Sequence, residues 1–162
     1  MIRIGQSTDI HRLKAGKPLI LGGVKIESEL GIVAHSDGDC LVHVIAEALL
    51  GALGLGDLGS HFSDQDPQYK NISSLVILKR VCDMMKERGY EIVNIDSTIL
   101  IEKPKLSHYI YKMKEALSKT LTVDPSQLNI KATTGEKVGI IGRQEAVVCE
   151  AVILIKERGY DE

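Results

Sequence analysis

The sequence predicts an α/β (α+β) protein in which a mixed β-sheet is covered on one face by helices. Segments patterned as strands alternate along the chain with segments patterned as helices, which is typical of a sheet with packed helices. The last strand is almost continuously apolar and therefore buried. The length of 162 residues suits one domain, since domains run to about 100–200 residues. We therefore expect a single domain over residues 1–162.

The N-terminal part is expected to form two strands and a long helix. Residues 1–8 and 18–27 have strand composition, and the Gly22-Gly23 pair in the second suits a bend or bulge. A helix is expected from Asp37 to about Gly54, with Ser36 or Asp37 as its N-cap. These elements would place a buried helix against the first strand.

A loop, a second helix and a strand follow. Residues 54–67 are rich in Gly, Asp and Ser, which predicts a loop. A helix is expected from about Ser73 to Arg88, ended by Gly89, and residues 90–101 are expected to form a strand. The apolar stripe of this helix is Leu75, Leu78, Cys82 and Met85.

The C-terminal part continues with a helix and two strands. Pro104 precedes a helix near 107–120, whose stripe is Ile110, Met113 and Leu117. Strands are expected at 128–134 and 145–156. If helices cover only one face of the last strand, another subunit is the simplest cover for the other face. A strand fully inside one chain is the alternative.

Composition excludes several classes of protein. With 20 basic and 22 acidic residues and a net charge of -2, the chain lacks the basic surplus of a nucleic-acid binder. The 3 cysteines are scattered and suit a reducing compartment rather than a disulfide framework. No apolar run reaches the roughly 20 residues of a membrane span, and the stretch MIRIGQSTDIHRL lacks the apolar core of a signal peptide. We therefore expect a soluble, cytoplasmic protein.

Three residues have the composition of a metal site. Asp9 and His11 are two apart on a strand and so project from the same face; alone, they could be an incidental ion pair at a solvated strand end. The helix from Asp37 is apolar nearly all round except at His43 and Glu47, which share a face. A single histidine there would more often be a core residue. Asp9, His11 and His43 together match an open catalytic zinc site with three protein ligands.

Two polar segments suit anions. His35, Ser36 and Asp37 open the helix, where free backbone N–H groups favour an anion, although ordinary capping explains them equally. The segment Lys131–Lys137 (KATTGEK) offers hydroxyls, lysines and a carboxylate for a phosphate and a hard divalent cation, although such strand ends are commonly turns. The sequence has no Walker loop, which argues against a generic nucleotide triphosphatase.

Three motifs resemble the 2-C-methyl-D-erythritol 2,4-cyclodiphosphate synthase family. They are the Asp9-x-His11-Arg-Leu start, the run AHSDGDCLVHVIAEALLGALGLGDLG and the segment KATTGEKVGIIGR. The resemblance covers the chain from Arg3 to about Ile155. It implies conversion of 4-diphosphocytidyl-2-C-methyl-D-erythritol 2-phosphate to the cyclic diphosphate with release of CMP, in non-mevalonate isoprenoid synthesis. It also implies a homotrimer of mixed α/β subunits with active sites between neighbours.

The resemblance implies a role for each matching residue. Asp9, His11 and His43 would bind zinc, Glu136 would help to hold Mg²⁺ or Mn²⁺, and His35 and Thr134 would stabilise the transition state. Asp57, Leu58 and Gly59 would line the methylerythritol pocket, and Ile101–Ser107 would enclose cytidine across the subunit interface. The substrate-binding residues implied are Asp9, Ile10, His11, His35, Ser36, Asp57, Leu58, Gly59, Phe62, Ser63, Asp64, Gln65, Asp66, Ile101, Pro104, Lys105, Leu106, Ser107, Thr133, Thr134, Gly135, Glu136, Ile140 and Arg143.

The chain departs from the family pattern without losing a metal ligand. Glu47 stands where Asp is usual, Gly135 where a polar residue is common and Ile140 where the residue is often aromatic, and the start reads Gly5-Gln6-Ser7-Thr8-Asp9. These departures bear on substrate affinity more than on reaction type.

Arg143 gives rise to a further hypothesis. In the family its region lines a cavity on the threefold axis, where an arginine could bind an isoprenoid diphosphate; an Arg143–Glu145 pair that closes the trimer is the alternative. Two rival functions stay open: a zinc-dependent phosphohydrolase, and a non-catalytic trimer that binds isoprenoid diphosphates.

Overall fold

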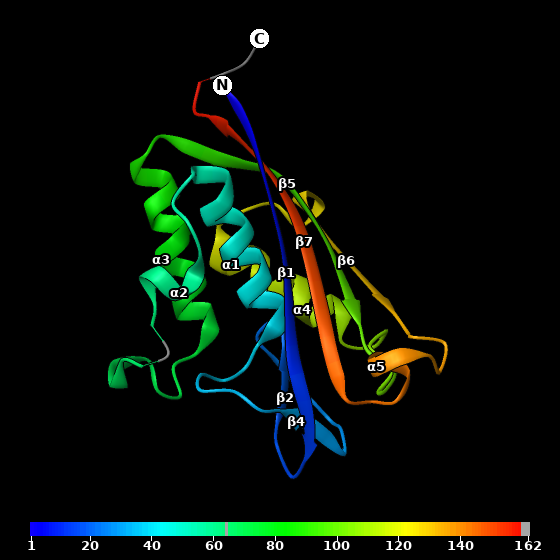
Figure 1. Cartoon of the computed structure of the whole chain (residues 1–162). Coiled ribbons are helices and arrows are strands. Elements are labelled where there is room, and N and C mark those ends of the chain that lie inside the picture. The colour runs from blue at the N-terminus through cyan, green and yellow to red at the C-terminus, as the bar shows by residue number, and fades with distance from the viewer. Residues whose placement is uncertain (64, 160–162) are drawn as a thin grey trace.

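The computed structural model describes residues 1–63 and 65–159, and it shows a mixed sheet with helices packed against it (Figure 1). The sheet has the strand order β4-β1-β7-β5-β6. Only the β5–β6 pair is parallel among these neighbours. The predicted mixed sheet is therefore confirmed. Its strands are β1 (Ile2–Ala15), β4 (Leu30–Ile32), β5 (Tyr90–Leu100), β6 (Leu128–Thr133) and β7 (Ala146–Glu157).

A small hairpin replaces the single strand expected over 18–27. Its strands are β2 (Leu19–Leu21) and β3 (Val24–Ile26). Gly22 and Gly23 connect them with φ of 59° and 75°, the positive values that a two-residue hairpin turn of type I′ requires. The prediction of a bend inside one strand was therefore wrong, because the glycine pair reverses the chain completely.

The long helix α1 (Cys40–Leu53) begins later than predicted. Neither Ser36 nor Asp37 is its N-cap; Asp39 is, and its side chain accepts a hydrogen bond from the backbone N–H of Val42. The same carboxylate accepts from the N–H groups of Gly22 and Gly23 at 2.8 and 2.6 Å. Asp39 therefore holds the hairpin turn and the start of α1 together.

The remaining helices are close to the predicted positions, with short additions. The stretch predicted as a loop contains α2 (Leu58–His61), followed by the 3₁₀ turn η1 (Pro67–Tyr69). α3 spans Ser74–Glu87, and Gly89 follows it with a positive φ of 77°. The other elements are α4 (Ile110–Leu121), η2 (Pro125–Gln127) and α5 (Gly139–Gly142).

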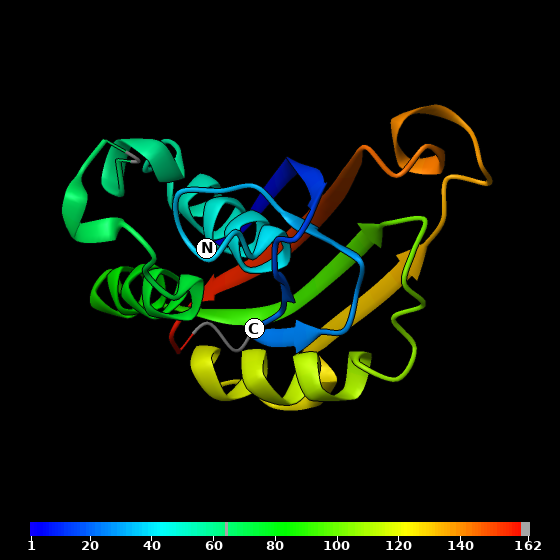
Figure 2. The ribbon, with the colours of Figure 1, turned by 90° about the horizontal axis from the view of Figure 1, so that it is seen from below.

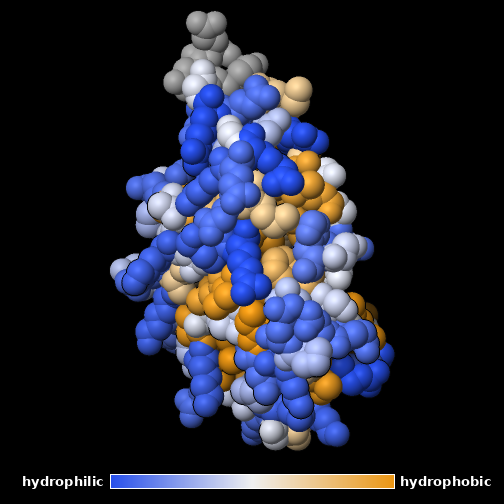
Figure 3. All heavy atoms as spheres, turned by 90° about the vertical axis from the view of Figure 1, so that its left-hand side faces the viewer, coloured by the Kyte–Doolittle hydropathy of each residue, from blue (hydrophilic) through white to orange (hydrophobic). Residues whose placement is uncertain are grey.

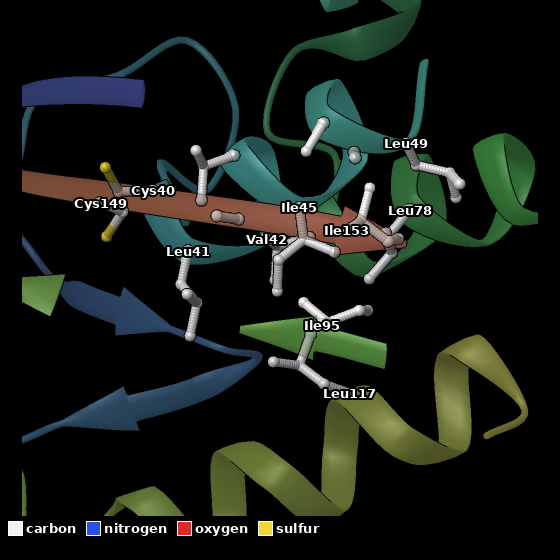
Figure 4. Close-up of a cluster of buried hydrophobic side chains, with 14 of the residues drawn as sticks. Cys40, Leu41, Val42, Ile45, Leu49, Leu78, Ile95, Leu117, Cys149 and Ile153 are labelled. Carbon is white, nitrogen blue, oxygen red and sulfur yellow. The ribbon is translucent and has the colours of Figure 1, made fainter. Parts of the chain in front are cut away.

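The helices lie on one side of the sheet (Figures 1 and 2). α1 packs along β1 and β7 and is buried along most of its length. Figure 4 shows part of the resulting core, in which Leu41, Ile45 and Leu49 of α1 and Ile153 of β7 belong to one cluster of buried side chains. On the side that carries α2 and α3, hydrophilic side chains dominate the surface (Figure 3).

The other face of the sheet is open in the single chain. In β7, Cys149 and Ala151 are buried under α1, whereas Glu150 and Val152 between and beside them are exposed. The strand is thus buried on one face only, which corrects the alternative of a strand fully inside one chain. Large apolar side chains are exposed on this open face, namely Ile2, Ile4, Ile10 and Val152. Among the described residues, no helix is long and apolar enough to cross a membrane.

Candidate metal and substrate site

Asp9, His11 and His43 meet between the sheet and α1. Asp9 and His11 are two residues apart on β1, so both side chains point toward the helices. His43 lies one turn after the start of α1. One potential ligand atom from each residue lies within 4.8 Å of the others. This is the only such group of three or more His, Cys, Asp or Glu side chains found in residues 1–63 and 65–159. The structure thus brings together the residues that the sequence pattern singled out.

The three side chains fit a divalent cation. Oδ2 of Asp9 lies 3.3 Å from Nδ1 of His11 and 3.6 Å from Nδ1 of His43. Nδ1 of His11 is buried and has no hydrogen-bond partner, because the contact with Asp9 is not aligned for a hydrogen bond. A ring nitrogen held in this way beside a carboxylate suits a ligand to a cation. One carboxylate and two imidazoles form a donor set that zinc accepts.

Asp9 and His11 stabilise each other's charged forms. Burial acts to raise the pKa of Asp9, but the neighbouring imidazole of His43 and the charge of His11 outweigh it and lower that pKa. Burial acts to lower the pKa of His11, but contact with Cys40 and the charge of Asp9 raise it overall. The site is therefore negative at Asp9, as a cation site requires.

Two thiols lie beside the group formed by Asp9, His11 and His43. Cys40 and Cys149 are both fully buried free cysteines, and Figure 4 shows them next to each other. Sγ of Cys40 donates to the backbone carbonyl of Asp9 at 3.4 Å. The hydrogen bond with Cys149 lowers the pKa of Cys40 to about 7, and burial raises the pKa of Cys149. Two buried, polarisable sulfur atoms are therefore packed beside Asp9, His11 and His43.

A pocket of about 230 Å³ opens above His11 and His43. Of the predicted substrate-binding residues, it gathers His35, Ser36 and Leu58 with the two histidines, and Phe62 and Ser63 complete its rim. Sequence reasoning missed five lining residues, Val33, Ala34, Tyr69, Ile72 and Ile77. They are apolar or aromatic residues of loop and helix, of which only Ala34 lies in a quoted motif, and the folded path of the chain brings them here.

Hydrogen bonds from neighbouring elements fix the turn that precedes α2. Asp57 caps α2, since its Oδ1 accepts from the N–H of Ser60 at 2.9 Å. Glu47 of α1 accepts from the N–H of Leu58 at 3.2 Å and from the hydroxyl of Ser7 at 2.6 Å. The unusual Glu47 thus has partners on β1 and at the start of α2. Its carboxylate thus ties Leu58, the first residue of α2, to α1 and β1.

The residues after α2 make local hydrogen bonds. Asp66 caps η1 through its contact with the N–H of Gln68 at 3.0 Å, and Gln65 donates its own N–H to Ser63. Asp64 lies outside the described residues.

Seven other predicted binding residues line a separate pocket of about 340 Å³. Its lining comes from the β5–α4 loop and the end of β6, and includes Ile101, Pro104, Lys105, Leu106, Ser107, Thr133 and Thr134, together with Glu102, Ile110 and Ala132. None of these residues lines the pocket above His43. A single chain therefore does not bring its two sets of predicted binding residues together.

Gly135 and Glu136 form a tight turn beside this second pocket. The N–H of Gly135 donates to Glu102 at 3.0 Å, and Oε1 of Glu136 accepts from Thr134 at 3.3 Å. Glu136 has a positive φ of 51° and is exposed. A Cβ at position 135 would lie 2.7 Å from the backbone of Gly142, so a larger residue here would require the backbone to shift.

Ile10 and Ile140 line a further pocket on the open face, with Arg12, Glu145 and Ala146. Close by, the guanidinium of Arg143 pairs with Glu145 at 2.8 Å, and both side chains are at least half exposed. The Arg143–Glu145 contact therefore forms within one chain.

Comparison with known proteins gives one consistent answer. The family model described as the YgbB family matches residues 2–156. The 2-C-methyl-D-erythritol 2,4-cyclodiphosphate synthase of Geobacillus sp. strain WCH70 is 48% identical over 158 residues, which are 98% of this chain and 100% of that protein.

Solved structures agree. The bifunctional IspDF of Campylobacter jejuni matches with a TM-score of 0.93 and 39% identity; the match covers 97% of this chain and 42% of that one. The CDP complex of IspF from Plasmodium falciparum matches with a TM-score of 0.87 and 36% identity over 98% of this chain and 97% of that one.

Proposed function

This chain belongs to the YgbB family, and we propose that its Asp9, His11 and His43 cluster is the centre at which it performs the family's cyclisation. Like the relatives named 2-C-methyl-D-erythritol 2,4-cyclodiphosphate synthase, it is an enzyme of non-mevalonate isoprenoid synthesis. The observation that carries the site is the convergence of one carboxylate and two imidazoles within 4.8 Å. The proposed catalytic domain spans residues 1–162.

The substrate carries its own nucleophile. An oxygen of the 2-phosphate of 4-diphosphocytidyl-2-C-methyl-D-erythritol 2-phosphate forms a bond to the β-phosphorus. The bond from that phosphorus to the oxygen of the α-phosphate breaks, and CMP leaves with the electron pair. The attacking oxygen is already ionised, so no side chain has to remove a proton. Catalysis then depends on positioning and charge stabilisation.

The residues around the pocket suit that task. Asp9, His11 and His43 would hold zinc, and Glu136 would help to hold Mg²⁺ or Mn²⁺. When bound, these cations supply Lewis acids that stabilise phosphoryl charge. His35 lines the pocket above the cluster and would donate to a phosphate oxygen, as Thr134 would from the second pocket.

The two ends of the substrate would occupy the two pockets. The methylerythritol part would bind beside Asp57–Gly59 and Phe62. Cytidine would bind between Ile101 and Ser107, where the backbone of the β5–α4 loop surrounds a largely apolar pocket. A relative is known as a CDP complex, which supports a cytidine diphosphate ligand.

We further propose a homotrimer in which each active site combines the metal cluster of one subunit with the cytidine pocket of its neighbour. Two observations support it. The two pockets share no lining residue within one chain, and the open face of the sheet exposes Ile4 by 68% and Ile10 by 55%. Apolar patches of this kind are typical of subunit interfaces.

Phosphorus NMR with the cytidine diphosphate substrate, zinc and magnesium tests the reaction. We expect CMP and a cyclic diphosphate. The same reaction in oxygen-18 water should leave the product phosphates unlabelled. A linear phosphate that carries the label would instead identify a zinc-dependent phosphohydrolase, and no turnover with retained isoprenoid diphosphate binding would identify a non-catalytic trimer.

A further inference from the structure

One ring nitrogen of His43 faces Asp9, and the other contacts a serine. Its Nδ1 lies 3.6 Å from Oδ2 of Asp9, and its Nε2 lies 2.8 Å from Oγ of Ser74. Ser74 is the first residue of α3 and is fully buried. The nearer of the two hydroxyl groups at Nε2 therefore belongs to a residue that is shielded from water.

Ser74 is also bound to Asp37 by both of its polar groups. Its hydroxyl makes a short hydrogen bond to Oδ1 of Asp37, and its backbone N–H donates to Oδ2 at 2.9 Å. Oδ1 accepts from the N–H of Asp39 as well, at 3.1 Å. An ionised carboxylate can only accept hydrogen bonds. The hydroxyl proton of Ser74 must therefore point to Asp37.

This direction decides which nitrogen of His43 carries its proton. Because the one hydroxyl proton of Ser74 is given to Asp37, the hydroxyl presents a lone pair to His43, and Nε2 must donate. In the neutral imidazole, Nδ1 then has a free lone pair, and that lone pair faces Asp9. Ser36 contacts the same Nε2 at a longer distance of 3.3 Å and accepts from Gly38.

We propose that Asp37 and Ser74 are positioning residues that fix His43 with its proton on Nε2 and its Nδ1 lone pair directed at the metal. The inference rests on the proposed function, since it assumes a metal at Asp9, His11 and His43. Partners that orient a ligating histidine typically contribute roughly 10–100-fold to metal affinity. The pair also joins α3 to the metal cluster, because Asp37 contacts the N-terminus of that helix.

Zinc titration of the metal-free protein against a chromophoric chelator tests the proposal. Ser74→Ala should weaken zinc binding by roughly 10–100-fold, and Ser74→Thr, which keeps the hydroxyl, should recover part of the loss. Ser73→Ala is the matched control, since Ser73 is the exposed neighbour whose side chain makes no capping hydrogen bond. Its zinc affinity should equal that of the wild type.

Long-range proton–nitrogen NMR of His43 supplies a readout that a merely structural role would not move. The metal-free wild type should show Nε2 protonated and Nδ1 unprotonated, and Ser74→Ala and Asp37→Asn should both shift His43 toward a mixture of the two forms. The positioning role of Asp37 and Ser74 would be overturned by a folded Ser74→Ala protein with wild-type zinc affinity, or by a wild type with the His43 proton on Nδ1. Zinc binding that is equally tight after His43→Ala would instead overturn the proposed metal site.

Discussion

Asp9, His11 and His43 meet because a repeat of two on β1 and the first turns of α1 direct their side chains to one point. Two of the three proposed ligands also have partners on the side away from the proposed metal. The backbone of Asp9 accepts from Cys40, and Nε2 of His43 contacts Ser74. A pre-positioned donor set of this kind binds a cation without first ordering its side chains.

His43→Ala should abolish tight zinc binding and turnover together. Removing a ligand should cost more than the roughly 10–100-fold that loss of a partner behind a ligand costs. Equilibrium dialysis with zinc and the phosphorus NMR assay measure the two effects. His108→Ala, at an exposed histidine away from the cluster, is the control and should leave both unchanged. Full turnover in folded His43→Ala would refute the metal assignment.

Glu47→Ala should raise KM more than it lowers kcat, because it releases the N–H of Leu58 and the turn beside the methylerythritol pocket. An unpaired buried partner costs about 1–3 kcal/mol, so thermal stability should fall as well. Glu47→Gln is the control, since its amide can accept from Leu58 and donate to Ser7. Steady-state kinetics with all three proteins compare the effects, and equal KM values would contradict the positioning role.

At the scale of elements, the sequence predicted most strands and helices because their apolar periodicity is strong. The predicted helix after Pro104 and the end of α3 at Gly89 agree with the structure. The failures are short and local. Whether Gly22-Gly23 bends or reverses a strand depends on Asp39, a partner 16 residues or more away. Such long-range contacts leave no periodic signal.

The cap of α1 shows the same limit. Asp37 and Asp39 are both good N-cap residues, and local preference cannot choose between them. The structure gives the cap to Asp39 and binds Asp37 to α3. The sequence pattern pointed to Asp9, His11 and His43 as metal ligands. It did not point to Ser74, because the neighbouring sequence does not distinguish Ser74 from Ser73.

The close approach of β1 and α1 predicts a strong effect at Gly5. A Cβ there would lie 1.9 Å from the carbonyl oxygen of Ala48, so Gly5→Ala must push backbone away from backbone. Overpacking typically costs about 1–3 kcal/mol, and this rigid contact belongs at or above that range. Gly51 lies on α1, and a Cβ there would have no atom within 4 Å. Gly51→Ala should therefore raise the free energy of unfolding by up to about 1 kcal/mol. Urea unfolding of both variants checks the opposite signs.

For the whole molecule, the open face of the sheet predicts assembly. Val152→Asp should dissociate the proposed trimer, because it places a charge on the exposed apolar face. Val76→Asp is the matched control: Val76 is 44% exposed and Val152 42%, but Val76 lies on α3, where the surface is already hydrophilic (Figure 3). Light scattering should report monomers for the first variant and unchanged particles for the second. A Val152→Asp protein of wild-type mass would exclude this face from the interface.

The proposed sharing of active sites between subunits predicts complementation. His43→Ala and Lys105→Ala alter different pockets, so mixed trimers reassembled from the two inactive proteins should contain some sites with both halves intact. Activity should therefore reappear on mixing. A mixture of His43→Ala and His11→Ala, which alter the same half, should stay inactive. If both mixtures stay inactive although the subunits exchange, each site belongs to one chain.

β1 carries Asp9 and His11 toward the helices and Ile10, between them, toward the open face. A deletion or insertion of one residue upstream in this strand would exchange the two faces beyond it. The metal ligands would then point outward and Ile10 inward. Single side chains of β1 can therefore change one at a time, whereas a one-residue change of register against β7 alters every position beyond it at once. The proposed metal site on one face and the proposed subunit interface on the other both depend on that register.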